Sequence, residues 1–323
     1  YAGRGDTRKG DRGMRIVAEH LSYTYNARSP FETAALKDVS LTIEEGEFFG
    51  IIGHTGSGKS TFVQHLNGLL RLPSSMKKYR PKKPKKGQAL PPAPVLRVGD
   101  FDLADKKTDF RALRRNVGMV FQYPEYQLFA ETVRDDVAFG LKNFSEKKLS
   151  DEQIDLAVKA ALEVVGLDYA QIKDKSPFEL SGGQKRRVAI AGVIVTKPEI
   201  LILDEPAAGL DPLGKQELMQ LLHDIHGGWC KTIVIVSHDM DEIAENCTRA
   251  AVFSAGKVVM CGTPAEIFRR SEELLALGLD IPVTAKCAQL LREKGFELET
   301  DFTCDDFVKK VLALREEEAR HAE

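Results

Sequence analysis

Residues 53–61, "GHTGSGKST", combine three glycines with one lysine and four hydroxyl side chains. Gly53, Gly56 and Gly58 allow backbone angles and close approaches that a Cβ would block, so successive N–H groups can form an anion nest. Lys59 can then reach the β- and γ-phosphates of a nucleotide, and Ser60 can offer its hydroxyl to Mg²⁺. The spacing fits G-x-x-x-x-G-K-[ST], so we predict a phosphate loop here rather than an ordinary glycine-rich turn.

Three further side chains follow apolar runs typical of buried strands. Asp204 closes "ILILD" and can bind Mg²⁺ directly or through water. Glu205 comes next and can polarise an attacking water. His238 closes "TIVIVSH", and the carboxyl ends of parallel strands share the edge where α/β folds bind ligands, so it can reach the γ-phosphate. A buried structural acid pair and an ordinary histidine are the alternatives.

A second anion site is predicted at "LSGGQ", residues 180–184, directly before a helical pattern. Ser181, Gly182 and Gly183 would form the helix N-terminus, where free N–H groups and the helix dipole favour negative charge. Two anion sites far apart in one chain are explained if the second completes a nucleotide held by another subunit.

These residues need a layered α/β scaffold to bring them together. Strand-like patterns occur at 15–25, 36–52, 200–204, 232–237 and 250–262. Helical patterns occur at 59–70, 151–166, 183–195 and 214–226. The alternation predicts an α/β fold around a mostly parallel sheet.

The composition narrows the class of protein. The chain has 323 residues, 43% of them hydrophobic and 29% charged, which is typical of a globular protein of about two domains. The net charge of −2 argues against a nucleic-acid partner. No apolar run reaches the roughly 18 residues of a membrane-spanning helix. The five cysteines form no C-x-x-C pair, so we expect no zinc site or disulfide framework, which fits a cytosolic setting.

Three segments stand apart from this pattern. Residues 1–13 are expected to be a flexible N-terminal tail. Residues 71–94 are rich in Lys, Arg and Pro and hold no acidic residue, so we expect a solvated inserted loop, with a nucleic-acid or anionic-lipid contact as the alternative. Residues 272–323 show short amphipathic helices, either a cap on the core or an interaction surface.

Taken together, the motifs resemble the nucleotide-binding subunits of ATP-binding cassette (ABC) transporters over residues 14–270. The resemblance identifies 53–61 as Walker A, Gln122 in "VFQYPE" as the Q-loop residue, 180–184 as the signature, Asp211 in "AGLDP" as the D-loop residue and His238 as the switch histidine. It implies a P-loop ABC fold with a RecA-like core, an antiparallel β subdomain and a helical signature subdomain, spanning 14–271, with a small C-terminal helical domain at 272–323.

Within that family, several stretches are similar to the ATPase subunits of energy-coupling factor (ECF) importers, which take up vitamins or transition-metal ions. They are residues 53–61, 121–140, 176–195 and 277–296. The last resembles a C-terminal dimerisation domain, and the chain is more similar to the second, A2-type (A-prime) subunit. The resemblance implies a second, different ATPase subunit, a transmembrane coupling protein and a small-molecule-binding membrane subunit as partners, at the cytoplasmic face of the cell membrane.

The resemblance also implies how the site works. Adenine would stack on Tyr25, with Tyr23 expected on the other face of its strand. Mg²⁺ would be held by Ser60, Gln122 and Asp204, and catalysis would rest on Glu205, His238, Gln122 and Lys59. The residues expected to contact ATP in this chain's own site are Tyr25, Gly53, His54, Thr55, Gly56, Ser57, Gly58, Lys59, Ser60 and Thr61. Those expected to contact the partner's ATP are Ser181, Gly182, Gly183, Gln184 and Asp211.

The sequence leaves three other assignments open. One is the ATPase subunit of an ABC importer outside the ECF group. Another is a soluble ABC ATPase acting on nucleic acid or ribosomes, which only the basic 71–94 segment favours. The third is an interaction subunit that does not hydrolyse ATP, which the complete set of catalytic motifs disfavours.

Overall fold

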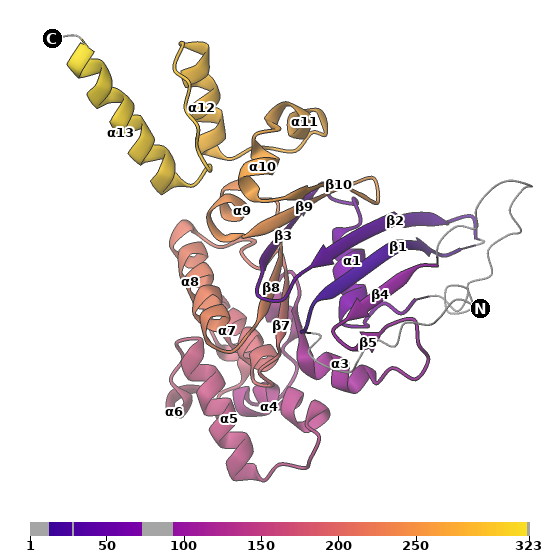
Figure 1. Ribbon diagram of the computed structural model, residues 1–323. Helices are drawn as coiled ribbons and strands as arrows, with labels where there is room; N and C mark the ends of the chain where they lie inside the picture. The colour runs from indigo at the N-terminus through magenta and orange to yellow at the C-terminus, as the bar shows by residue number, and fades with distance from the viewer. Residues whose placement is uncertain (1–12, 28, 73–92, 322–323) are drawn as a thin grey trace, which may run out of the picture.

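The computed structural model describes residues 13–27, 29–72 and 93–321. Nearly all of the predicted N-terminal tail, 1–13, and of the basic 71–94 segment therefore lies outside the described residues. Within the described part of the chain, the strands form a four-stranded and a six-stranded sheet (Figure 1).

The smaller sheet is antiparallel, with strand order β2-β1-β4-β5. Its strands are β1 (Ile16–Tyr25), β2 (Thr33–Ile43), β4 (Val95–Val98) and β5 (Phe101–Asp102). The buried residues of β1 alternate in its first half, as expected for a strand with one covered face. This sheet packs over α1 (Lys59–Leu66), and the two share one apolar core with one side of the larger sheet (Figure 1).

The larger sheet has strand order β10-β9-β3-β8-β7-β6, parallel from β9 through β6, with β10 antiparallel at one edge. Its strands are β3 (Phe48–Gly53), β6 (Val117–Val120), β7 (Ile200–Asp204), β8 (Thr232–Val236), β9 (Arg249–Ser254) and β10 (Lys257–Gly262). Strands β3, β6, β7 and β8 are buried along their whole length, as parallel strands covered on both faces must be.

The remaining described helices lie around the larger sheet and beyond it; most cover its other face, whereas Leu113 of Phe110–Asn116 packs in the core on the α1 side. They are α3 (Phe110–Asn116), α4 (Val133–Phe144), α5 (Asp151–Val164), α6 (Tyr169–Ile172), α7 (Gly182–Ile194), α8 (Pro212–Gly228), α9 (Met240–Asn246), α10 (Pro264–Phe268), α11 (Ser271–Ala276), α12 (Val283–Glu293) and α13 (Cys304–His321). Two 3₁₀ turns, Pro124–Gln127 and Pro177–Glu179, precede α4 and α7. None of the described helices combines the length and apolar character needed to cross a bilayer.

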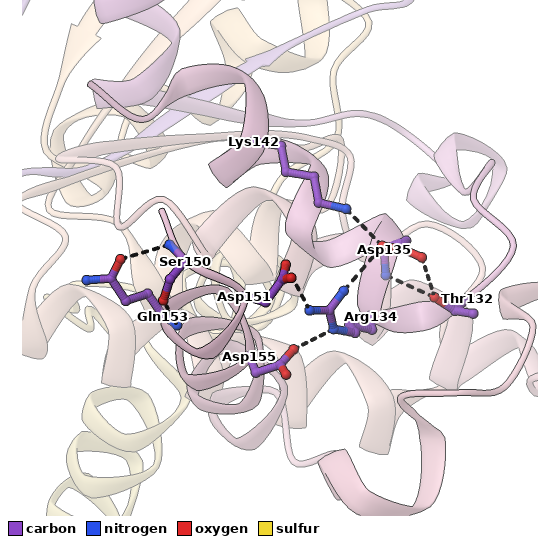
Figure 2. A network of polar contacts seen from close by, with 8 residues as sticks. All are labelled: Thr132, Arg134, Asp135, Lys142, Ser150, Asp151, Gln153 and Asp155. Carbon is purple, nitrogen blue, oxygen red and sulfur yellow. Dashed lines mark hydrogen bonds and ion pairs between the residues drawn. The ribbon is translucent and has the colours of Figure 1, made fainter. Parts of the chain in front are cut away.

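Helices α4, α5 and α7 pack on one another as one unit. Figure 2 shows its polar connection, in which Arg134 at the start of α4 contacts Asp151 and Asp155 of α5. Lys142 lies about two turns further along α4, and its Nζ donates a 2.8 Å hydrogen bond to Asp135 Oδ1. The side chain of Arg134 is only 24% exposed, so these contacts fix the relative orientation of α4 and α5.

The C-terminal helices α12 and α13 project from the end of the molecule opposite α5 and α6 (Figure 1). Ile281, Ala285 and Phe302 belong to the same buried cluster as Phe268 of α10, so this segment shares the main core. The side chains of Leu290 and Leu312 are more than half exposed. The division at residue 271 remains a prediction.

The structure confirms the predicted α/β class and the long helices at 151–166, 183–195 and 214–226, within about three residues. It also adds elements that the sequence patterns did not reveal: β4, β5, β6, α3 and α4. The apolar run at 250–262 is a hairpin of β9 and β10, because Gly256 at φ 84° turns the chain back.

Candidate functional site

The phosphate loop lies between the end of β3 and the start of α1, as the motif requires. Gly53, Gly56 and Gly58 have φ values of 150°, 79° and 105°. A Cβ on Gly58 would lie 2.6 Å from the carbonyl oxygen of Ala35, so a larger residue is excluded by space as well as by conformation. The loop therefore has the backbone geometry predicted for an anion nest.

The lysine of this loop is buried and bound to the loop's own backbone. Lys59 Nζ donates hydrogen bonds to the carbonyl oxygens of Gly53, at 2.5 Å, and His54, at 2.9 Å. Burial lowers the pKa of Lys59, while the carboxylates of Glu205 and Asp204 act to raise it. The ammonium group is thus already desolvated and faces acidic groups at the sheet edge.

Asp204 ends β7 and is almost fully buried, and the Ser60 hydroxyl hydrogen-bonds its carboxylate. Burial is the main cause that raises the pKa of Asp204; the nearby charge of Glu205 also raises it, and Ser60 and Lys59 act against both. A buried carboxylate next to a loop hydroxyl is the donor set that Mg²⁺ uses with phosphate oxygens. These two side chains come together because β3 and β7 both flank β8 in the sheet.

Glu205 is the point where three segments meet. Gln122 Nε2 donates a 2.9 Å hydrogen bond to Glu205 Oε2, and His238 Nδ1 lies 3.5 Å from the same oxygen. The register pairs Asp204 with Val236, so the residues that follow β7 and β8 are neighbours. Glu205 has φ 50°, and its N–H donates to the Val236 carbonyl oxygen at 2.9 Å, which holds this uncommon backbone conformation.

A cavity of about 340 Å³ opens beside these groups. Its lining includes Gln122, Glu205, Ser237 and His238. The side chain of His238 is 71% exposed, whereas that of Glu205 is 22% exposed. The carboxylate is therefore sheltered and the imidazole is open to a ligand or a partner.

The signature segment, residues 180–184, starts α7 as predicted. Ser181 is the N-cap: its hydroxyl accepts from the Gln184 N–H at 3.3 Å, and Gln184 Oε1 accepts from the Ser181 N–H at 3.1 Å. A Cβ built on Gly182 or Gly183 would meet no atom within 4 Å. The lining of the cavity at Glu205 contains no residue of this segment. The signature thus faces open space.

Asp211 and Tyr25 have clear local roles. Asp211 caps α8 by accepting from the Gly214 N–H at 2.7 Å. The Tyr25 hydroxyl lies 3.2 Å from Thr61 Oγ1, so this ring borders the phosphate loop. The expectation that Tyr23 faces the other side of β1 was wrong: its ring packs edge-on against that of Tyr25, with centroids 4.9 Å apart. Side chains two residues apart on a strand share a face.

His54, inside the phosphate loop, contacts a segment far along the chain. Its Nε2 donates to the carbonyl oxygen of Leu277, at 2.5 Å, just after α11. A long-range contact of this kind leaves no trace in local sequence. Within the predicted loop, Thr55 and Gly56 are exposed, Ser57 is buried, and Thr61 lies in the first turn of α1.

The comparisons with known proteins agree with this geometry. The family model described as ABC transporter matches residues 36–208. The "Energy-coupling factor transporter ATP-binding protein EcfA2" of Clostridium tetani is 45% identical over 302 residues, covering 93% of this chain and 97% of that protein. The protein of the same name from Symbiobacterium thermophilum is 49% identical over 305 residues, covering 94% and 96%.

The chain belongs to the energy-coupling factor group of ABC transporter ATP-binding proteins. It is an ATPase subunit of an ABC importer, and its hydrolysis of ATP is coupled to transport.

The similar solved structures include the following two. One is cbiO1 from Clostridium perfringens, described as part of the ABC transporter complex cbiONQ. It is 35% identical, with a TM-score of 0.64 and coverage of 85% of this chain and 98% of that one. The other is the ATP-binding cassette MJ0796, dimeric and bound to ADP and Pi, 26% identical with a TM-score of 0.64 and coverage of 77% and 98%.

One buried group in this region was not singled out from the sequence. Arg186 of α7 is 8% exposed. It contacts Glu125 of the Q-loop segment and the backbone at Ala208, which follows Glu205. The helical spacing of the sequence could have predicted its burial, because Arg186 lies on the same helix face as the buried Ala189 and Ile190. An arginine on the buried face of a helix requires partners.

Proposed function

We propose that this ATPase powers the uptake of a vitamin or a transition-metal ion across the cytoplasmic membrane, bound peripherally at its cytoplasmic face. The proposal that this chain hydrolyses ATP through Glu205 rests on one observation: Gln122 and His238 both approach the same oxygen of the Glu205 carboxylate. The similarity to energy-coupling factor proteins supports the type of importer.

In the proposed mechanism, adenine stacks on Tyr25 and the phosphates lie along the 53–61 loop. Lys59 leaves the Gly53 and His54 carbonyl groups and turns to the β- and γ-phosphates. Ser60, Asp204 and Gln122 would hold Mg²⁺, which would supply charge neutralisation at the phosphates. Among the described residues no group of three His, Cys, Asp or Glu forms a metal cluster, and a Mg²⁺–nucleotide site needs only one or two carboxylates besides phosphate oxygens.

Glu205 is proposed to orient and deprotonate the attacking water, with His238 bonding to the γ-phosphate. Both groups reach the same point at the sheet edge, and the 22% exposure of the Glu205 side chain strengthens its electrostatic interactions with neighbouring groups. Lys59 and the loop N–H groups stabilise the charge that develops on the phosphate oxygens.

The second nucleotide contact is proposed to act between subunits. Ser181, Gly182 and Gly183 face open space and form a capped helix N-terminus, which suits the γ-phosphate bound by a partner ATPase. Gln184 and Asp211 would line the same interface. The dimeric form of the similar MJ0796 cassette supports this arrangement. We propose a heterodimer with a related, different ATPase subunit.

The membrane partners are proposed to dock beside the Q-loop segment. A groove of about 290 Å³ is lined by Phe121, Phe129, Phe139 and Val193, among others, between the Q-loop segment, α4 and α7. Phe129 is 60% exposed and Tyr126 is 84% exposed. Exposed aromatic side chains around an apolar groove are typical of a protein interface. A transmembrane coupling protein would insert here, and a small-molecule-binding membrane subunit would complete the importer.

The test is purification of the tagged chain from its host's membranes in mild detergent, with the co-purifying proteins identified by mass spectrometry. A second ATPase and polytopic membrane proteins are expected, and the cargo-binding subunit would direct an uptake assay. Phe129→Ser should lower their recovery at least about fivefold. The control Leu156→Ser, on an α5 side chain that is 71% exposed and outside the groove lining, should not.

Recovery with ribosomes or nucleic acid, and with no membrane protein, would overturn the importer proposal. Equal recovery of membrane partners with Phe129→Ser and Leu156→Ser would overturn the docking groove alone.

A further inference from the structure

A buried arginine lies one turn into the signature helix α7. Arg186 is 8% exposed, whereas the side chain of its neighbour Arg187 is 42% exposed and pairs with Glu217 of α8 at 2.6 Å. Taking a guanidinium group out of water is costly unless its donors are satisfied. The partners of Arg186 therefore show what this position is built to hold.

Arg186 binds two segments that lie far apart in the sequence. Its Nε and Nη2 point to the two carboxylate oxygens of Glu125, at 3.3 and 3.5 Å. Its Nη1 donates to the Pro206 carbonyl oxygen at 3.3 Å, and Nη2 donates to the Ala208 carbonyl oxygen at 2.9 Å. The arginine thus joins the turn Pro124–Gln127 to the backbone that follows Glu205.

These contacts close a ring around Glu205. Glu125 comes three residues after Gln122, and Gln122 donates to the Glu205 carboxylate. Pro206 follows Glu205 directly, and the Ala208 N–H donates to the Glu205 carbonyl oxygen at 3.2 Å. The ring therefore fixes Glu205 from its side chain and from its backbone, at a residue whose φ of 50° needs outside support.

We propose that Arg186 is a positioning residue that links the signature helix to Glu205 and to the Q-loop segment. This inference rests on the proposed function, in which Glu205 activates water in this chain's own site while α7 reaches the partner's nucleotide. Movement of α7 then changes the position of the Glu205 carboxylate in this chain's own nucleotide site. The ring makes the two nucleotide sites of a dimer depend on each other.

The surrounding contacts give this link a route to the membrane partner. Helix α7 packs against α4, α5 and the turn Pro124–Gln127. The groove proposed for docking is lined by α4 and α7 together with the Q-loop segment. The Arg134 network ties α4 to α5 (Figure 2), so these helices move together. A partner that shifts this unit would shift Arg186 with it.

The chemistry requires arginine rather than lysine at this position. The acceptors are the Glu125 carboxylate and the carbonyl oxygens of Pro206 and Ala208, which lie on two separate segments. The fixed, planar donors of a guanidinium can reach all three, whereas a lysine ammonium is a single point charge on a flexible side chain. Arg186→Lys keeps the positive charge and loses the geometry. Glu125→Gln keeps an acceptor oxygen and loses the negative charge.

The test uses the complex purified through a tag on this chain. ATP affinity is measured by equilibrium binding, and single-turnover hydrolysis is read as loss of label from γ-labelled photoreactive ATP cross-linked to this chain. Arg186→Lys and Glu125→Gln should leave the Kd within about twofold and slow hydrolysis by about 10- to 100-fold, the scale of small errors in catalytic geometry. Glu217→Gln, which removes the carboxylate facing Arg187, is the matched control and should change neither.

A double-mutant cycle separates positioning from general loosening. Arg186→Lys combined with Glu125→Gln should be no slower than the slower single variant, because both break one ring. Additive losses, or slowing that only follows a lower melting temperature, would overturn the inference. If Arg186→Lys does not fold, Glu125→Gln decides alone.

Failure of the inference and failure of the proposed function give different results. Normal hydrolysis by Glu205→Gln would refute the role of Glu205 itself. A Glu205→Gln complex that fails to hydrolyse ATP, beside normal Arg186→Lys and Glu125→Gln complexes, would refute only the role of the ring.

Discussion

Gln122 Nε2 donates a 2.9 Å hydrogen bond to Glu205 Oε2 across 83 residues of sequence. The two residues follow β6 and β7, which are adjacent and parallel, so their carboxyl ends meet. His238, after β8, approaches the same oxygen. A single carboxylate is therefore linked to the segment that leads to the proposed docking groove and to His238.

The aromatic ring beside the phosphate loop can be tested through nucleotide affinity. Tyr25→Ala should raise the Kd for ATP about five- to tenfold, because an aromatic contact contributes about 1 kcal/mol beyond area burial. Tyr25→Phe keeps the ring and should stay within about twofold, despite losing the hydroxyl contact with Thr61. Binding of inorganic triphosphate, measured by calorimetry, should be the same in all three proteins. An equal loss of triphosphate binding in Tyr25→Ala would show that the ring supports the loop rather than adenine.

A buried histidine predicts a pH dependence of stability. His65 is fully buried; its Nδ1 donates to the Thr61 carbonyl oxygen at 2.6 Å, and its Nε2 has no hydrogen-bond partner. Burial lowers the pKa of His65, with the Thr61 contact opposing. The unfolded chain, with a histidine pKa of about 6.5, then binds a proton that the folded chain does not. The free energy of unfolding is therefore highest above about pH 6.5. It decreases as the pH falls from there through the lowered pKa of His65 in the folded chain.

Urea unfolding from pH 7.5 to 5 measures this effect. His65→Phe should reduce the fall in unfolding free energy, by up to about 1.4 kcal/mol per pH unit for one proton. The control His226→Gln removes a half-buried histidine whose Nε2 contacts the Lys231 carbonyl oxygen, and it should leave the fall nearly unchanged. Identical slopes in wild type and His65→Phe would contradict the assignment.

Two carboxylates after the switch histidine cap the C-terminal helices. Asp241 Oδ1 accepts from the Val283 N–H at 2.8 Å, and Glu245 Oε1 accepts from the Cys304 N–H at 2.6 Å, at the first residues of α12 and α13. Each contact should be worth about 1 kcal/mol as a cap. Asp241→Ala should therefore speed amide hydrogen exchange in α12 by about fivefold, and Glu245→Ala should do so in α13. Glu163→Ala on α5 is the control, and unchanged exchange in both cap variants would contradict the assignment.

Much of the site follows from local sequence, because its chemistry depends on short motifs. The 53–61 loop, the end of β7 at Asp204 and the start of α7 lie where the patterns predict, since glycine, capping and strand-end signals act within a few residues. Sheet order then brings Asp204 and Glu205 beside His238.

The rest depends on long-range packing that no local pattern encodes. The contact of His54 with Leu277 spans 223 residues. The ring that Arg186 closes around Glu205 joins segments that meet only when α7 packs against the sheet. Short strands such as β5, with two residues, carry too little periodicity to be detected. The predicted face of Tyr23 was wrong, because side chains two residues apart on a strand share a face.

The central claim is that Glu205 activates the water that attacks ATP. The decisive measurement compares wild-type and Glu205→Gln complexes, purified through this chain and incubated with Mg²⁺ and γ-labelled photoreactive ATP before cross-linking. Glu205→Gln should bind ATP normally and keep the label on this chain, with hydrolysis slowed at least about 100-fold. Loss of the label at the wild-type rate would contradict the account.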